Sequence, residues 1–179
     1  MIRALLIVAA LATTARAESD KLANRTTTIA ALGLVYMQVD GITNSGLAVQ
    51  PIVTRTFDRF ELQADYLLAD LRDDSERMPG SYLHRFGFAA RYQAARTRVD
   101  REMTLDFVVE AGVGLQYLAF DNGDTLGRND FEAGIGLRML SDVTHGKRVF
   151  MGMELMFRGL VAPGGDKAFT FSFGVPFGS

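Results

Sequence analysis

FELQADYLLA, residues 60–69, alternates an apolar set of side chains with a second set that includes Glu61, Gln63 and Asp65. A period of two matches the geometry of a β-strand, in which successive side chains point to opposite faces. One face of this segment therefore meets an apolar environment and the other meets a more polar one. The rest of the chain decides whether the apolar environment is a protein core or a lipid bilayer.

The same alternation recurs in five later segments, at residues 82–93, 104–117, 130–139, 148–158 and 168–177. Across all six segments the apolar face carries no formal charge, and only His84 interrupts it. A face that excludes charge over six segments is predicted to contact a region without water.

Two earlier segments complete a set of eight strands. Residues 47–57 alternate in the same way, with Arg55 on the apolar face, where its long side chain must reach the interface. Residues 26–39 are apolar on both faces, so their pattern alone does not orient them. If glycine marks the inner face here as it does elsewhere, Gly33 points inward. The residues then expected to point outward are Leu32, Leu34 and Tyr36.

The more polar face does not have the composition of a surface in contact with bulk water. All three lysines (Lys21, Lys147 and Lys167) lie outside the predicted strands, whereas seven glycines share this face with acids and arginines. A lipocalin-like barrel or a secreted sandwich would expose a face rich in lysine, glutamate and threonine. Small residues beside opposite charges fit the narrow lumen of about eight strands. We therefore predict an all-β, eight-stranded antiparallel up-and-down transmembrane β-barrel.

The connections between the predicted strands support this topology, because outer-membrane barrels alternate short periplasmic turns with longer external loops. The predicted external connections are residues 40–46, 70–81, 121–129 and 161–167, and the predicted internal ones are residues 58–59, 95–102 and 141–147. Long and short connections mostly alternate, with both ends of the chain in the periplasm.

The N-terminus has the features of a cleaved signal peptide. Arg3 precedes the apolar residues 4–12, and Ala15 and Ala17 form an A-x-A cleavage site. This apolar run is too short for a membrane-spanning helix, which needs roughly 20 residues. The predicted domains are a signal peptide (1–17), a short periplasmic segment (18–25), the barrel (26–177) and a C-terminal tail (178–179).

Composition excludes several other classes. The chain has no cysteine, so it has neither a disulfide framework nor a cysteine that could carry a lipid. Its net charge is −2 and its isoelectric point is about 5.7, without clusters of lysine and arginine. Nucleic acid is therefore not expected as a partner.

The last predicted strand carries a recognisable pattern of apolar and aromatic residues: Phe169, Phe171, Phe173, Val175 and Phe177. It resembles the C-terminal signal by which outer-membrane proteins are recognised for assembly. Residues 26–177 as a whole resemble the OmpA/OmpX-type outer-membrane β-barrel superfamily. The resemblance implies the outer membrane of a Gram-negative bacterium. The expected partners are outer-membrane lipid, lipopolysaccharide and the β-barrel assembly machinery.

The inner face is predicted to carry a network of charged residues. Its main candidates are Glu61, Asp65, Arg85, Arg91, Asp106, Glu110, Glu132, Arg138, Glu154 and Arg158, and Asp130 and Arg148 share the face. Charges in a space closed to bulk water need partners, because an unpaired one is costly. These residues form either a salt-bridged plug or a narrow path for ions, water or small solutes, in which the excess of acids favours cations.

An enzymatic function is not supported by the residues. A lipid-modifying barrel enzyme would carry a histidine and a serine two positions apart, but Phe86 occupies that position relative to His84. His145 falls in a predicted internal turn, and residues 121–124, Asp-Asn-Gly-Asp, lack the spacing of a calcium loop. No catalytic residue, cofactor site or metal site is therefore assigned.

Two functional hypotheses remain open. A lipid-modifying enzyme is a third alternative, which the residues do not support. The first is a structural or surface-interaction role through the external loops at residues 70–81 and 121–129, toward a ligand that the sequence does not identify. The second is a narrow channel. The two hypotheses differ in whether the lumen conducts.

Overall fold

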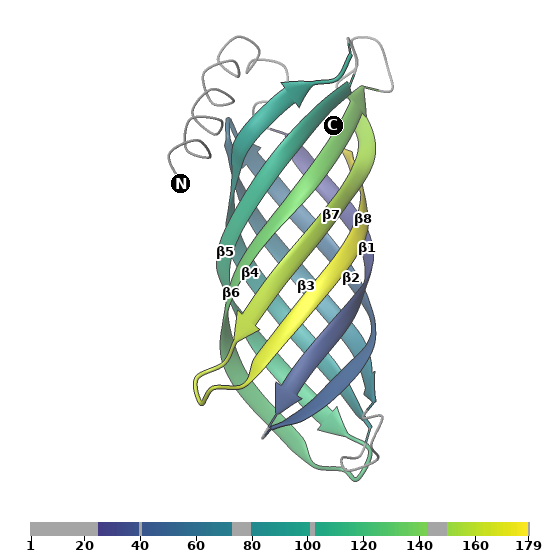
Figure 1. Cartoon of the computed structure of the whole chain (residues 1–179), viewed down its shortest axis with the longest axis vertical. Coiled ribbons are helices and arrows are strands. Elements are labelled where there is room, and N and C mark those ends of the chain that lie inside the picture. Colours follow the sequence, from purple (N-terminus) through teal and green to yellow (C-terminus); the bar gives the residue numbers. More distant parts are fainter. Residues whose placement is uncertain (1–24, 40, 73–79, 101–102, 143–149, 179) are drawn as a thin grey trace, which may run out of the picture.

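Eight antiparallel strands close into a barrel, as the sequence predicts (Figure 1). The computed structural model describes residues 25–39, 41–72, 80–100, 103–142 and 150–178. The strands are β1 (Thr26–Val39), β2 (Ile42–Phe57), β3 (Phe60–Arg72), β4 (Ser81–Arg98), β5 (Met103–Phe120), β6 (Thr125–Asp142), β7 (Phe150–Val161) and β8 (Lys167–Gly178). Each strand pairs with its neighbours in the chain, and β1 pairs with β8 to complete the closure.

The two ends of the barrel carry different connections. Thr27 pairs with Gly178, so both ends of the described chain lie at one end of the barrel, which we call the termini end. β2, β4 and β6 end there, and β3, β5 and β7 begin there (Figure 1). The opposite end of the barrel, where β1, β3, β5 and β7 end, is called the loop end. This is the alternation that an up-and-down barrel requires.

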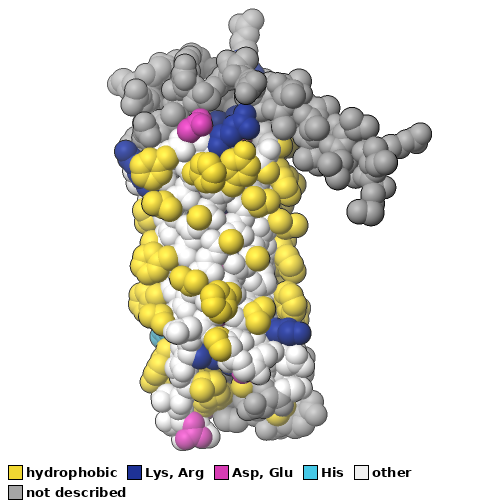
Figure 2. All heavy atoms as spheres, turned by 90° about the vertical axis from the view of Figure 1, so that its left-hand side faces the viewer, with side chains coloured by type: hydrophobic (Ala, Val, Ile, Leu, Met, Phe, Trp, Pro, Cys, Tyr) yellow, Lys and Arg dark blue, Asp and Glu magenta, His cyan; other side chains and the backbone are white. Residues whose placement is uncertain are grey.

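The outer face of the barrel is apolar. Leu32, Leu47 and Phe88 are 65–74% exposed, and exposed apolar side chains occur on the outer face of every strand. Figure 2 shows such side chains along the visible face, with charged side chains only toward its two ends. An exposed apolar surface of this extent fits contact with lipid. No helix in the described residues is long and apolar enough to cross a membrane.

The orientation of β1, which its sequence left open, follows from these exposures. Leu32, Leu34 and Tyr36 are 43–65% exposed, whereas Val35 is fully buried. The assignment based on Gly33 is therefore confirmed. Arg55 of β2 also lies on the outer face near the termini end, where it donates a hydrogen bond of 2.8 Å to the hydroxyl of Thr26.

Several strands are longer than their alternation predicts. β2 begins at Ile42 instead of residue 47, because backbone hydrogen bonds continue the ladder whatever the side chains are. Gly41 makes this short turn possible, since its φ of 80° suits glycine. β6 begins at Thr125 instead of residue 130. β8 begins at Lys167, so this lysine opens a strand, and the strand runs on to Gly178, which was expected in the tail.

Candidate functional site in the barrel lumen

The inner face of the barrel changes character along the barrel axis. On β3, Asp65 is followed on the inner face by Leu67, and on β7, Arg158 is followed by Leu160. In both strands the apolar residue lies on the side of the loop end. The lumen therefore has a charged section toward the termini end and an apolar section toward the loop end.

Arg138 organises the part of the charged section nearest the termini end. Its Nη1 and Nη2 atoms donate hydrogen bonds of 2.9 and 2.6 Å to the two carboxylate oxygens of Glu61, and Nη2 lies 3.3 Å from Asp106. Arg138 belongs to β6 and Glu61 to β3, which are not neighbours in the sheet. This two-point contact spans the lumen and pairs charges that have no access to water.

Two further arginines continue the network toward the middle of the barrel. Arg91 donates a hydrogen bond of 2.8 Å to Glu154 and lies 3.4 Å from Glu110. Arg158 pairs with Glu110 through its Nε atom and reaches the side-chain oxygen of Gln50 at 3.2 Å. The carboxylate of Glu110 therefore forms ion pairs with two arginines from different strands, Arg91 of β4 and Arg158 of β7.

Arg85 lies at the boundary with the apolar section and meets three carboxylates. Its Nη2 atom is 2.8 Å from Asp130 and 2.7 Å from Glu132, and its Nη1 atom is 3.3 Å from Asp65. The space for its guanidinium comes from glycine. A Cβ atom added to Gly114 would lie 2.6 Å from the Nε and Nη2 atoms of Arg85.

The structure places all of the main candidates inside the barrel, with side chains no more than 6% exposed: Glu61, Asp65, Arg85, Arg91, Asp106, Glu110, Glu132, Arg138, Glu154 and Arg158. Asp130 joins them at 1% exposure. Arg148 lies outside the described residues. The charged section is thus a buried set of ion pairs.

The apolar section of the lumen was not anticipated, because the inner face was expected to hold mainly glycine and paired charges. It consists of Val35, Met37, Val39, Ala48, Leu67, Ala69, Leu71, Leu83, Leu118, Leu160 and Ala168, with Phe120 and Leu126 packed against them. We call these residues the apolar plug. Near the loop end β3 and β5 are apolar on both faces, at residues 66–69 and 117–120, and this loss of alternation is the signal available in the sequence.

Two arginines of the lumen were missed. Arg96 was assigned to a turn, but a β-bulge between Gln93 and Ala95 adds a residue to β4 and reverses the faces beyond it. Its side chain consequently makes hydrogen bonds of 2.6 and 2.9 Å to Asp106. Alternation counted at a fixed period of two cannot reveal such a shift.

Arg25, the second missed arginine, was expected in a periplasmic segment. It is only 4% exposed and stacks over the ring of Phe150, 4.8 Å from the ring centre. Burial lowers the pKa of its guanidinium to about 9, and the positive charge of Arg138 acts in the same direction. Arg25 thus closes the termini end of the charged section.

No family model and no curated protein matches the sequence. Neisserial surface protein A superposes with a TM-score of 0.60 at 10% identity, over 84% of this chain and 95% of that one. This protein has the fold of the small eight-stranded outer-membrane barrels.

Two other solved structures align at lower scores. The N-terminal barrel domain of OprF from Pseudomonas aeruginosa has a TM-score of 0.49 at 17% identity, over 87% of this chain and 98% of that one. Ail from Yersinia pestis has a TM-score of 0.49 at 10% identity, over 88% and 100%. The assignment of this small outer-membrane barrel fold rests on the first match together with the closed eight-stranded topology.

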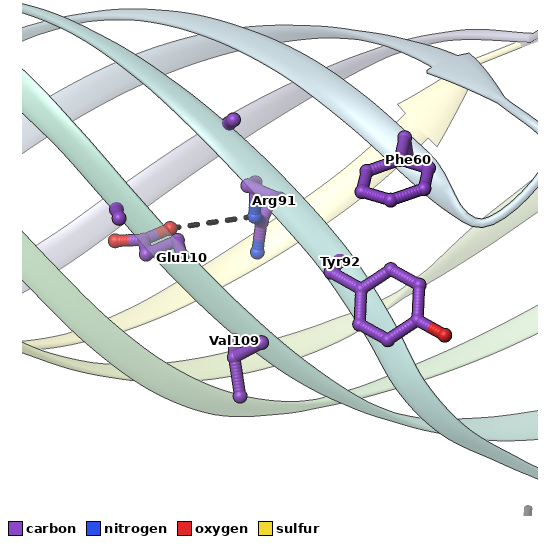
Figure 3. Close-up of a pocket in the computed structure, with 7 residues that line it drawn as sticks. Phe60, Arg91, Tyr92, Val109 and Glu110 are labelled. Carbon is purple, nitrogen blue, oxygen red and sulfur yellow. Dashed lines mark ion pairs between the residues drawn. The ribbon is translucent and has the colours of Figure 1, made fainter.

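The outer surface of the barrel carries a hollow of about 230 Å³ between β3, β4 and β5. Phe60 and Tyr92 stand at its edge with ring centres 5.0 Å apart, and Ala90 and Ala111 form part of its lining. Figure 3 shows Arg91 and Glu110 beside it, joined to one another by their ion pair. Almost all of the exposed lining is apolar, so the hollow does not present the polar groups that a catalytic pocket needs.

His84 lies on the outer face of β4 and is engaged by neighbouring aromatic residues. Its Nδ1 atom is 2.6 Å from the hydroxyl of Tyr66, and its ring centre is 6.4 Å from that of Tyr117. His145 lies outside the described residues. Within the described residues, no group of three or more acidic, histidine or cysteine side chains is arranged to hold a metal ion.

Ion pairs brace the rim of the loop end. Arg72, at the end of β3, is 2.9 Å from both Asp70 and Asp121, and the amide of Asp121 donates to the carbonyl of Gly80. On the other side of the rim, Arg128 pairs with Asp166. These contacts tie the described parts of the β3–β4, β5–β6 and β7–β8 connections to the barrel.

Proposed function

We propose that this protein is a non-conducting barrel of the outer membrane that acts as a scaffold, with the loop end facing the cell exterior and the termini end facing the periplasm. Its role is structural or depends on contacts made by its loops. The apolar outer face and the fold support the membrane location. In this proposal the chain is exported with a signal peptide that is cleaved after Ala17. Its terminal strand, residues 169–177, is then recognised for assembly into the membrane.

The observation that carries this proposal is the closure of the lumen at two levels. Charged side chains in the middle of the barrel are at most 6% exposed and are held in ion pairs. The apolar plug then fills the lumen toward the loop end. A permeating ion would have to break the pairs and also shed its water to pass an apolar region, and both steps are costly.

The alternative of a narrow cation-selective channel has support only from the excess of acids in the charged section. The apolar plug weighs against it, because the buried side chains at this height are mostly apolar, with Asn44 and Ser81 as polar exceptions, and offer few groups to replace the water around an ion. The enzymatic alternative would need a serine near a free histidine nitrogen, and His84 already has its Nδ1 atom against Tyr66.

The loop rim is the proposed contact surface. Its described parts are polar and are held in place by the pairs of Arg72 with Asp121 and of Arg128 with Asp166. A surface ordered before binding loses less conformational entropy when a partner binds. The structure supports this surface without identifying its ligand.

Planar-bilayer recording tests the closed lumen. Purified, folded protein is expected to give no reproducible single-channel steps. Folding is checked in the same sample by heat-modifiable migration on a detergent gel, so that a silent preparation is not an unfolded one. Regular steps from folded protein would overturn the non-conducting proposal.

The absence of native cysteine allows a direct test of orientation. Asn122→Cys places one thiol in the exposed β5–β6 turn at the loop end, and Val99→Cys places one at the termini end, where Val99 is 56% exposed. A membrane-impermeant maleimide is expected to label only Asn122→Cys on intact cells and both variants after the outer membrane is permeabilised. The reverse labelling would contradict the proposed orientation.

A further inference from the structure

The centre of the lumen holds more negative than positive charge. Arg85 is shared by Asp65, Asp130 and Glu132, and all four side chains are at most 6% exposed. Three ionised carboxylates around one guanidinium would leave two negative charges without compensation. Such an excess away from water is unfavourable, because like charges disfavour the ionised form and burial does so as well.

The hydrogen bonds show which carboxylate is least supported as an anion. Asp130 accepts three hydrogen bonds of 2.8–3.1 Å from Arg85. Asp65 accepts one from Arg85 at 3.3 Å, and one each from the amides of Gln50 and Gln63 at 3.0 Å. Both oxygens of Glu132 are buried without a hydrogen bond, although one of them lies 2.7 Å from Arg85.

The strands next to Glu132 supply no free cation. On β7, Leu160 lies opposite Glu132, and Arg158 opposite Gly134 is already paired with Glu110. On β5, Gly112 lies opposite Glu132, and the side chain of Glu110 fills the space over Gly134. The charged groups that face Glu132 are therefore Arg85, Arg158, Asp65, Glu110 and Asp130. Acids outnumber arginines even before Glu132 is counted.

We propose that Glu132 is a proton-binding site, and that the folded barrel holds an exchangeable proton on this carboxyl group at neutral pH. Binding converts the carboxylate and one solvent proton into a neutral carboxyl group, which removes one of the two excess charges and provides an O–H donor to the acids beside it. A proton fits better than a metal ion, because no group of acids in the described residues is arranged to hold a metal.

This site makes the stability of the barrel depend on pH. In the unfolded chain a glutamate releases its proton near pH 4.3, so between that pH and neutrality the folded state binds one proton more than the unfolded state. The contribution of Glu132 to stability is then fully present below that pH and is lost as pH rises. Each pH unit of this range changes the unfolding equilibrium constant about tenfold.

Urea unfolding between pH 5 and pH 8, followed by gel migration, tests the proposal with Glu132→Gln as the central variant. The difference in urea midpoint between this variant and the wild type is expected to grow with pH. At pH 8 the variant should unfold at a higher urea concentration than the wild type. Any pH dependence that comes from other groups is shared by the two proteins and cancels in this difference. Parallel curves for the two proteins would overturn the proposal.

Asp130→Asn is the matched control, because Asp130 shares Arg85 with Glu132 but accepts three hydrogen bonds from it. It is expected to unfold at lower urea than the wild type at pH 8 and to retain the pH dependence. If Asp130→Asn abolished the pH dependence and Glu132→Gln did not, the proton would belong to Asp130 and the assignment to Glu132 would be wrong.

Infrared spectroscopy of the folded wild type provides a readout that does not need any variant to fold stably. A protonated carboxylic acid band is expected at pH 7, and its loss in Glu132→Gln would assign it. Absence of the band in the wild type would refute the proposal. A shift in the urea midpoint with sodium or potassium concentration at constant ionic strength, present in the wild type and lost in Glu132→Gln, would show a metal cation in place of the proton and would also refute it.

Discussion

The charged section and the apolar plug occupy the same lumen, yet they hold the barrel together by different physical means. In the charged section, Arg138 and Glu61 meet across the barrel through directional contacts between non-adjacent strands. In the plug, residues such as Leu83 and Leu118 fill space without directional contacts. The first section specifies which strands face one another, and the second excludes water. The comparison predicts that substitutions in the two sections fail in different ways.

The largest loss of stability is expected for Arg138→Ala. It would leave Glu61 as a buried carboxylate without its main partner, which costs about 4 kcal/mol in similar cases, whereas Asp106 would keep its two hydrogen bonds from Arg96. Urea unfolding measures the loss. The double variant Arg138→Ala with Glu61→Gln should recover part of it, because one uncompensated charge is removed. No recovery in the double variant would mean that the charged section does not act through pairing.

A smaller loss, about 3 kcal/mol, is expected for Leu118→Ala, which opens a cavity in the plug. The matched control is Leu115→Ala on the outer face of the same strand, where Leu115 is 61% exposed. Lipid or detergent can fill the space left there, so the control should lose less. Equal losses at the two positions would show that the plug is not closely packed.

The lumen is closed by two sections, so both must be opened before it conducts. Leu83→Ser combined with Leu118→Ser introduces hydroxyl groups and space into the plug but leaves the ion pairs of the charged section in place, so planar-bilayer recording should still show no regular steps. Glu61→Gln, which changes only the charged section, should also leave the barrel silent. Conductance steps are expected only from the triple variant, and steps from either of the first two variants would assign the seal to the section that it changes.

A loss of about 2 kcal/mol is expected for Gly114→Val, because the added side chain would overlap the guanidinium of Arg85 and push it away from Asp130. Gly127→Ala is the control, since nothing lies within 4 Å of the added Cβ atom there. Equal urea midpoints for the two variants would contradict the idea that glycine makes room for Arg85.

The smallest effect is expected for Arg72→Ala at the loop rim. Arg72 pairs with Asp70 and Asp121 at distances similar to those inside the barrel, but all three side chains are about half exposed. Water and salt screen such pairs, so the urea midpoint should not change measurably. A loss comparable to that of Arg138→Ala would mean that burial does not explain the difference between lumen and rim.

Regions of clear alternation were predicted correctly, and the errors occur where alternation fails. The outward pattern at Phe169, Phe171 and Phe173 follows from one strand's own residues, and these residues are 43–50% exposed. The bulge near Ala95 turned Arg96 inward. The early start of β2 at Ile42 depends on backbone pairing with β1. Neither of these two features is encoded in the period of the side chains.

The amino-acid sequence by itself determined the eight strands, the outward face and the charged residues enclosed by the barrel apart from Arg25 and Arg96, because a period of two is a local property of each strand. The tertiary structure decided which charges meet. Arg138 reaches Glu61 across the lumen and three acids gather at Arg85 only after closure sets the register of all eight strands. Closure likewise brings apolar residues from separate strands to one height as the plug, and leaves both carboxylate oxygens of Glu132 buried without a hydrogen bond.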